Sequence, residues 1–202
     1  MSIKNIYTEI TSFENLLQAE KDSRAGKRYE TEQLQFWGDL EGNLHSVMDR
    51  LRTHEYPPDI YHHFYVYEPK LRKVIYSDYT TKVIQRAAYN VLNPLVCKGM
   101  ISDTYSCIKE RGQLKSMQRL AEWVDYCEKS GERWYYLKMD VAKFFYRMNH
   151  EILMNIIRKK IGDKQAVRFL GALCLSRIQS LRSFRVGLVL LWIFPMMKCC
   201  GM

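Results

Sequence analysis

Residues 134–153, WYYLKMDVAKFFYRMNHEIL, hold an apolar and aromatic run that ends in a single carboxylate, Asp140. Aromatic and apolar side chains in such a short run favour a β-strand, so we predict a strand over Trp134–Asp140. Alternate side chains of a strand share a face, which would place Tyr136, Lys138 and Asp140 together. A carboxylate at the end of this strand would therefore lie at the rim of a sheet, open to solvent.

Two roles are open to Asp140. Mg²⁺ favours sites built from one or two carboxylates together with substrate phosphates and water, and an accessible carboxylate at a sheet rim suits such a site. The alternative is an N-cap, because a helix-like segment, VAKFFYRM, follows directly. On spacing alone the cap is favoured.

The flanking sequence predicts alternating helices and a hairpin. Leu34, Trp37, Leu40, Leu44, Val47 and Leu51 recur at helical spacing and predict one amphipathic helix over 31–56. Residues 61–78 are rich in aromatic and β-branched side chains and predict a hairpin or two adjacent strands. We expect further helices from Asp78, as N-cap, to Pro94, over 113–130 with Leu114, Met117, Leu120, Ala121 and Val124 facing inward, and from Asn149 to Gly162. The fold class expected from this mixture is α+β.

Charge is distributed unevenly along the 202 residues. The net charge is +9, but residues 1–163 hold 25 basic and 22 acidic side chains, whereas residues 164–202 hold six basic side chains and no acidic one. A basic balance suggests a nucleic-acid partner or an anionic surface. The body of the chain is only mildly basic, so the whole-chain value overstates that argument.

The six cysteines and the apolar segments bear on the compartment. The cysteines form no CxxC pair, which favours reduced thiols in a cytoplasmic protein over a zinc site. The polar N-terminus does not have the pattern of a signal peptide. The run Val186–Phe194 is shorter than the roughly 20 residues that a membrane-spanning helix needs. We therefore expect no membrane association.

Three segments in order along the chain resemble one family. YLKMDVAKFFYRMNHEIL, which contains Asp140, resembles the first metal-binding motif of bacterial reverse transcriptases of the group II intron, retron and diversity-generating types. YEPKLRKVIYSDYTTKVIQRAAYNVLNPLV, residues 67–96, is similar to the fingers motifs of that family, and ISDTYSCIKERGQLKSM, residues 101–117, to the segment that follows them. The resemblance spans roughly residues 57–165. It implies the fingers and the beginning of the palm of a right-hand polymerase, with an incomplete fold.

The resemblance implies roles for individual residues. Asp140 would be the first catalytic metal ligand, with the Val141 carbonyl as a further Mg²⁺ ligand. Phe145 would exclude a ribose 2′-hydroxyl, and Lys70 and Arg72 would contact the triphosphate of the incoming dNTP. Side chains that would contact phosphates of the template and primer are Arg86, Arg111, Lys115 and Arg119.

Each of these roles has a structural alternative. Phe145 or its neighbour Phe144 could simply pack in a core. Lys70 and Arg72 could protect an exposed hairpin edge. The remaining basic side chains could belong to solvated helix faces.

Later motifs of the family are absent from this sequence. It contains neither a Pro-Ile-Gly-Asn segment nor a Tyr-x-Asp-Asp hairpin, and no acidic residue follows Asp163. One carboxylate cannot hold two magnesium ions. We therefore expect this truncated chain to be inactive alone.

The tail, LSRIQSLRSFRVGLVLLWIFPMMKCCGM, is atypical of a globular protein. Reading from the third base of each codon, the genetic code allows Ser-Asp-Asp-Glu-Met-Leu-Trp-Asp in place of the segment that begins at Phe194. We hypothesise that the reading frame was lost near Leu175–Arg177, which resequencing of the locus would test. The alternatives are a tail that packs as a buried helix or strand and, less favoured, a membrane-surface peptide.

The organisation that follows has four parts: an N-terminal helical extension over 1–56, a fingers region over 57–133, the start of the palm over 134–176 and the aberrant tail over 177–202. The function implied by the resemblance is RNA-directed DNA synthesis, in which two Mg²⁺ ions assist transfer of a nucleotide from dNTP to a primer 3′-OH. The implied partners are an RNA template, a DNA primer, dNTP and a retroelement accessory protein. The alternative is a basic, non-catalytic nucleic-acid-binding remnant of a retroelement protein.

Overall fold

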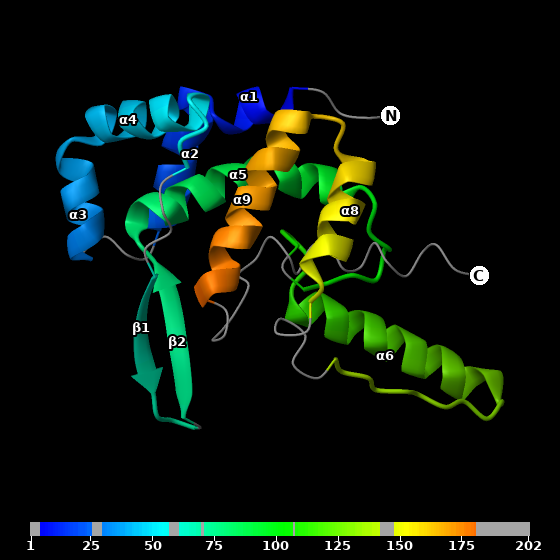
Figure 1. Cartoon of the computed structure of the whole chain (residues 1–202). Helices are drawn as coiled ribbons and strands as arrows, with labels where there is room; N and C mark the ends of the chain where they lie inside the picture. The colour runs from blue at the N-terminus through cyan, green and yellow to red at the C-terminus, as the bar shows by residue number, and fades with distance from the viewer. Residues whose placement is uncertain are drawn as a thin grey trace.

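The computed structural model describes residues 5–25, 30–56, 61–69, 71–106, 108–141 and 148–180. Within them the chain is a mixture of helices and one small antiparallel sheet, as the expected α+β class requires. The elements, in order, are α1 Ile6–Ile10, α2 Phe13–Arg24, α3 Thr31–Gly38, α4 Leu40–Arg52, β1 Tyr61–Val66, β2 Arg72–Ser77, α5 Tyr79–Cys97, α6 Gln113–Ser130, α8 His150–Lys160 and α9 Lys164–Ser180 (Figure 1).

Helix α5 runs through the centre of the helical body. Asp78 caps it by accepting from the Thr81 N–H at 3.4 Å, as predicted. Its buried stripe includes Val83, Ala87 and Ala88 and packs against α2. The helix does not end at Pro94 as predicted but continues to Cys97. Proline here removes one hydrogen bond, to the carbonyl of residue 90, without ending the helix.

The core joins the two ends of the described chain. Buried side chains from α1, α2 and α4 share one cluster with those of α5, α8 and α9, and Phe169 of α9 is fully buried in it. The Tyr7 ring meets Phe169 at 5.7 Å, and its hydroxyl donates to the Leu51 carbonyl. Burial, followed by a hydrogen bond with Tyr56, raises the pKa of Tyr7. The N-terminal helices therefore form part of the same core as the C-terminal pair.

The segment 31–56 forms two helices, so the prediction of one helix was wrong. The break falls after Gly38, where Asp39 starts α4 by accepting from the Gly42 N–H at 3.2 Å. A Cβ at position 42 would collide with the Asp39 carboxylate, so glycine permits this close cap. Leu44, Val47 and Leu51 are buried as expected, whereas Leu34 and Trp37 are exposed because α3 turns a different face, that of Gln33 and Phe36, inward.

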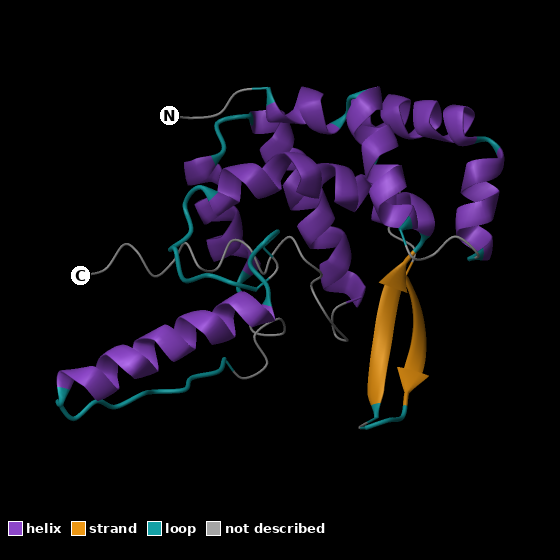
Figure 2. Cartoon of the chain, turned by 180° about the vertical axis from the view of Figure 1, so that it is seen from behind, coloured by secondary structure: helices purple, strands orange, loops and turns teal. Residues whose placement is uncertain are grey.

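Strands β1 and β2 form the predicted antiparallel hairpin. Its register pairs Tyr61 with Ser77 and Val66 with Arg72. The hairpin projects from one side of the helical body, and α6 lies on the other side (Figures 1 and 2). The hairpin and α6 therefore lie on opposite sides of the helical body and not side by side.

Helix α6 has the predicted bounds and ends at Gly131, whose φ of 65° is the left-handed conformation that glycine favours at a helix end. The predicted burial was wrong, since none of its residues is buried in the described structure. Leu114, at 72% exposed, is the most exposed of its large apolar side chains, and Leu120 and Trp123 are also exposed. This helix therefore presents an uncovered apolar face.

Helix α9 packs against α8 on one side and against α1 on another. Helix α8 begins beside Asn149, close to the predicted start, and the Asn149 side chain caps it by accepting from the N–H groups of Glu151 and Ile152. Asp163 caps α9 through Gln165 and Ala166. Its second oxygen accepts from the Tyr7 N–H at 2.8 Å, which links α9 to α1.

Helix α9 continues through Leu175–Arg177, the position at which the sequence suggests a loss of reading frame. Among the described residues, no helix combines the length and apolar character needed to cross a bilayer.

Candidate active site

Asp140 lies near the end of an exposed irregular segment. The predicted strand over Trp134–Asp140 is not formed, because no strand of the described chain lies beside it to complete a backbone ladder. The segment after Gly131 turns back alongside α6, where the Trp134 Nε1–H donates to Ser130 Oγ at 2.7 Å (Figure 1). Its side chains are exposed, Tyr136 to 92%. Because this strand is not formed, Lys138 and Asp140 do not share a strand face as predicted.

The Asp140 carboxylate is accessible. Its Oδ1 accepts from the N–H of Val141 at 2.9 Å, and the described structure gives it no ion pair. Of the helix-like segment that it was expected to cap, residues 141–148, residues 142–147 lie outside the described part. An exposed carboxylate with one local hydrogen bond can accept a cation at the cost of little rearrangement.

The oxygen donors at Asp140 can supply only part of the coordination shell of one magnesium ion. Its carboxylate and the Val141 carbonyl are oxygen donors of the type that Mg²⁺ takes, with water and phosphate completing the shell. Within the described residues, no group of three or more His, Cys, Asp or Glu side chains could hold a metal. Two-ion chemistry would therefore need carboxylates that this part of the chain does not supply.

Most of the side chains expected to contact dNTP lie outside the described structure. Lys70 and Phe145 lie outside the described residues, and the Arg72 side chain is also not described. Arg72 begins β2, opposite Val66. Both views place this hairpin apart from the segment that ends at Val141 (Figures 1 and 2). The structure does not bring the strand of Arg72 beside Asp140.

Arg86 is held against α2. Its Nε and Nη2 both donate to Asp22 Oδ2 at 3.2 Å, and its guanidinium lies 4.8 Å from the centre of the Tyr89 ring. The ion pair is partly exposed, so Arg86 retains access to solvent. The paired acid neutralises much of the charge that a phosphate would otherwise meet.

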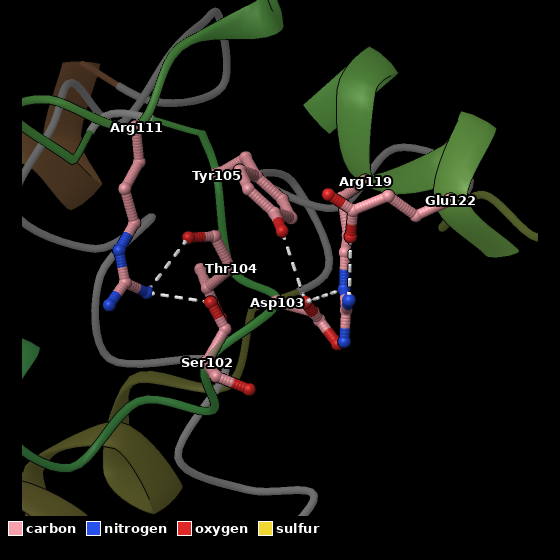
Figure 3. A network of polar contacts seen from close by, with 7 residues as sticks. All are labelled: Ser102, Asp103, Thr104, Tyr105, Arg111, Arg119 and Glu122. Carbon is pink, nitrogen blue, oxygen red and sulfur yellow. Dashed lines mark hydrogen bonds and ion pairs between the residues drawn. The ribbon is translucent and has the colours of Figure 1, made fainter. Parts of the chain in front are cut away.

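Arg111 orders the loop before α6. Its Nη1 donates to the carbonyls of Ser102, at 2.8 Å, and Thr104, at 3.4 Å (Figure 3). The main chain turns tightly here, since the Arg111 N–H donates to the Ile108 carbonyl and Glu110 has a φ of 66°. Lys115 Nζ donates to the Glu110 carbonyl at 3.2 Å. Both basic side chains thus contact the backbone of the loop that precedes α6.

Arg119 connects the same loop to α6. Its Nε donates to Asp103 at 3.2 Å and its Nη1 to Glu122 at 2.8 Å, while the Tyr105 hydroxyl also donates to Asp103 (Figure 3). The Glu122 hydrogen bond is the main cause that raises the pKa of Arg119. Loss of solvation, followed by the hydrogen bond to Asp103, raises the pKa of Tyr105.

The three basic residues of this region therefore have structural contacts, and Asp103 and Glu122 offset the charge of Arg119. These contacts order the loop before α6, and the phosphate contacts that the resemblance implies stay a prediction.

Sequence reasoning missed a group of amides between α2 and α5. Asn15 and Gln18 lie three residues apart on α2, and Asn90 and Asn93 have the same spacing on α5; all four line one cavity. Paired amides at this spacing share a helix face, a signal that the sequence does contain.

It also missed a buried acid. Glu20 is fully buried and accepts from the Tyr79 hydroxyl at 3.2 Å. Its polarity gave no sign of burial, because an acid on an amphipathic helix is expected to face water.

No protein-family model and no curated protein sequence matches this chain.

Proposed function

We propose that the chain derives from an RNA-directed DNA polymerase, with Asp140 as the carboxylate that contributed to magnesium binding. In this proposal the β1–β2 hairpin and α5 correspond to fingers, and α6 with the segment ending at Val141 corresponds to the beginning of a palm. The parent reaction would transfer a nucleotide from dNTP to a primer 3′-OH.

The observation that carries the proposal is the exposure of the Asp140 segment together with α6. Tyr136 and Leu137 of that segment and Leu120 of α6 are apolar or aromatic side chains in water. Exposed apolar surface of this extent is unusual in a monomeric protein. The arrangement agrees with a palm whose remaining strands would pair with the segment and cover the helix.

The chain alone is expected to be inactive, because Asp140 supplies a single carboxylate. An assay of primer extension on an RNA template, with Mg²⁺ and all four dNTPs, tests this expectation. Incorporation above the background of Asp140→Ala would contradict it.

The lineage itself is tested by the nucleotide sequence beyond codon 175. Codons for Pro-Ile-Gly-Asn and Tyr-x-Asp-Asp in another frame would support the proposal. An uninterrupted frame with no upstream insertion or deletion, and no such codons in any frame, would refute it.

The incomplete metal donor set favours a second candidate, a nucleic-acid-binding protein without catalysis. It predicts binding to RNA and DNA that weakens with salt, is indifferent to sequence and is unchanged in Asp140→Ala. Electrophoretic mobility shifts at several salt concentrations would measure this. Catalysis that requires Asp140 would exclude the second candidate.

A further inference from the structure

A cavity with a mixed polar and apolar lining and a volume of about 510 Å³ lies where α2 meets α5, and Ile108 and Lys109 of the loop between α5 and α6 line one part of it. Its volume falls in the range of roughly 300–1,000 Å³ that small-molecule sites occupy. Asp140 does not line it, and Arg86 is the one lining residue with a role implied by the family resemblance. The cavity is therefore distinct from the candidate active site.

The cavity wall is unusually rich in side-chain amides. The Asn15 Nδ2 donates to the carbonyls of Ile10 and Ala87, each at 3.1 Å, which fixes its orientation across the α2–α5 junction. Gln18 Nε2 donates to Asp22 Oδ1 at 2.9 Å. Helix α2 therefore presents two polar side chains to this space that are held by hydrogen bonds.

Asn90 is left unsatisfied by the fold. Its side-chain Nδ2 is buried and has no hydrogen-bond partner among the described residues. Its main-chain carbonyl also lacks the usual donor four residues later, because Pro94 has no N–H. A buried donor without an acceptor destabilises the fold, so an acceptor that arrives with a ligand would recover that stability.

Basic groups complete the lining. Arg86 is anchored by Asp22, and its guanidinium lies 4.8 Å from the centre of the Tyr89 ring; a guanidinium plane and an aromatic ring are surfaces of the kind on which bases stack. Lys109 is exposed and forms no ion pair within the described part of the chain. It can therefore approach an anion without first breaking a contact.

We propose that this cavity binds a nucleotide. Asn90 and its neighbouring amides offer the adjacent donors and acceptors that match the edge of a base, while Lys109 pairs with the phosphate. An apolar ligand would leave these amides desolvated, and an inorganic anion would leave the acceptors of the amides unmatched. The inference deepens the proposed function, since an RNA or DNA strand would supply such a nucleotide, but it does not depend on metal binding at Asp140.

The test is titration of the full chain with AMP, adenosine and orthophosphate. Isothermal calorimetry measures the affinity of each, and amide NMR shifts locate the residues that respond. AMP is expected to bind more tightly than adenosine or orthophosphate, with shifts at Gln18 and Asn90. A short single-stranded oligoadenylate distinguishes a nucleotide within a strand from a free one. If AMP binds no better than orthophosphate, the cavity is not a nucleotide site.

Two variants and a matched control define the contacts. Asn90→Leu keeps the branched shape of the side chain, removes the unpartnered donor and is expected to weaken AMP binding at least about tenfold, the effect of losing one hydrogen bond of about 1.4 kcal/mol. Lys109→Ala should weaken AMP but not adenosine, whereas Lys164→Ala, an exposed lysine on α9 outside the cavity, should change neither.

A melting curve verifies that each variant is folded. If Asn90→Leu does not fold, Gln18→Leu takes its place in the binding measurement. Unchanged AMP binding in the folded cavity variant would overturn the inference. Asp140→Ala should bind AMP as the parent chain does, and loss of binding there would place the nucleotide at Asp140 instead. Failure of the polymerase proposal, through an uninterrupted reading frame, would leave the AMP result unaffected, so the two can fail separately.

Discussion

Replacing Asp163 with alanine should destabilise the fold more than the loss of an ordinary helix cap. One carboxylate oxygen caps α9 through two N–H groups, and the other accepts from the Tyr7 N–H at 2.8 Å. The cap contributes about 1 kcal/mol, and a hydrogen bond to a charged acceptor about 1.5–3 kcal/mol. Asp163→Ala should therefore cost about 2.5–4 kcal/mol. At roughly 2–4 °C per kcal/mol for a chain of this size, the melting temperature should fall by about 5–15 °C.

Two further variants separate the cap from the link between α1 and α9. Asp39→Ala removes an exposed cap that has no long-range bond and should cost about 1 kcal/mol. Asp163→Asn retains a capping oxygen but weakens the acceptor for the Tyr7 N–H. Its loss of unfolding free energy should therefore lie between those of the two alanine variants.

The free energies are measured by urea denaturation followed by circular dichroism, with equal m-values as the criterion that the unfolded states are comparable. If Asp163→Ala proves no more destabilising than Asp39→Ala, the contact with Tyr7 contributes nothing and the reasoning is wrong.

Three other predictions concern the loop, the core and α6. Glu110→Gly should stabilise the chain by about 0.5–1 kcal/mol in urea denaturation, because glycine adopts the positive φ without strain; a loss of stability would contradict this. Burial, followed by the contact with Glu20, raises the pKa of Tyr79, so the neutral phenol stabilises the fold fully below pH 10 and this contribution declines as the pH rises further. Stability measured from pH 8 to about 11 should therefore fall less steeply in Tyr79→Phe than in the parent, and equal slopes would exclude the effect. Leu120→Glu should change the free energy of unfolding by less than about 0.5 kcal/mol while reducing self-association in analytical ultracentrifugation, whereas a large loss of stability would show that α6 is covered after all.

Local signals in the sequence determined the elements whose ends are set by neighbouring residues. Asp78 and Asn149 bear short polar side chains that cap the N–H groups two or three positions later, and Gly131 tolerates the left-handed turn that ends α6. The hairpin was also predictable, because its two runs are close in sequence and rich in β-branched and aromatic residues. In each case the deciding contact lies within a few residues.

Tertiary structure decided which faces are buried and which polar groups meet. The apolar stripe of α6 has the same spacing as that of α5, yet only α5 has α2 packed against it, so periodicity could not show that α6 stays exposed. The segment before Asp140 has strand-forming residues, but the described part of the chain provides no partner strand for it, and a strand requires hydrogen bonds from a second segment.

Long-range polar contacts were likewise invisible in the sequence. The burial of Glu20 beneath Tyr79, the link between Asp163 and Tyr7, and the meeting of amides from α2 and α5 each join residues that are more than fifty positions apart. The sequence determined the character of each of these side chains, and the packing of the helices alone determined what each one meets, because hydrogen bonds and burial depend on distance in space and not along the chain.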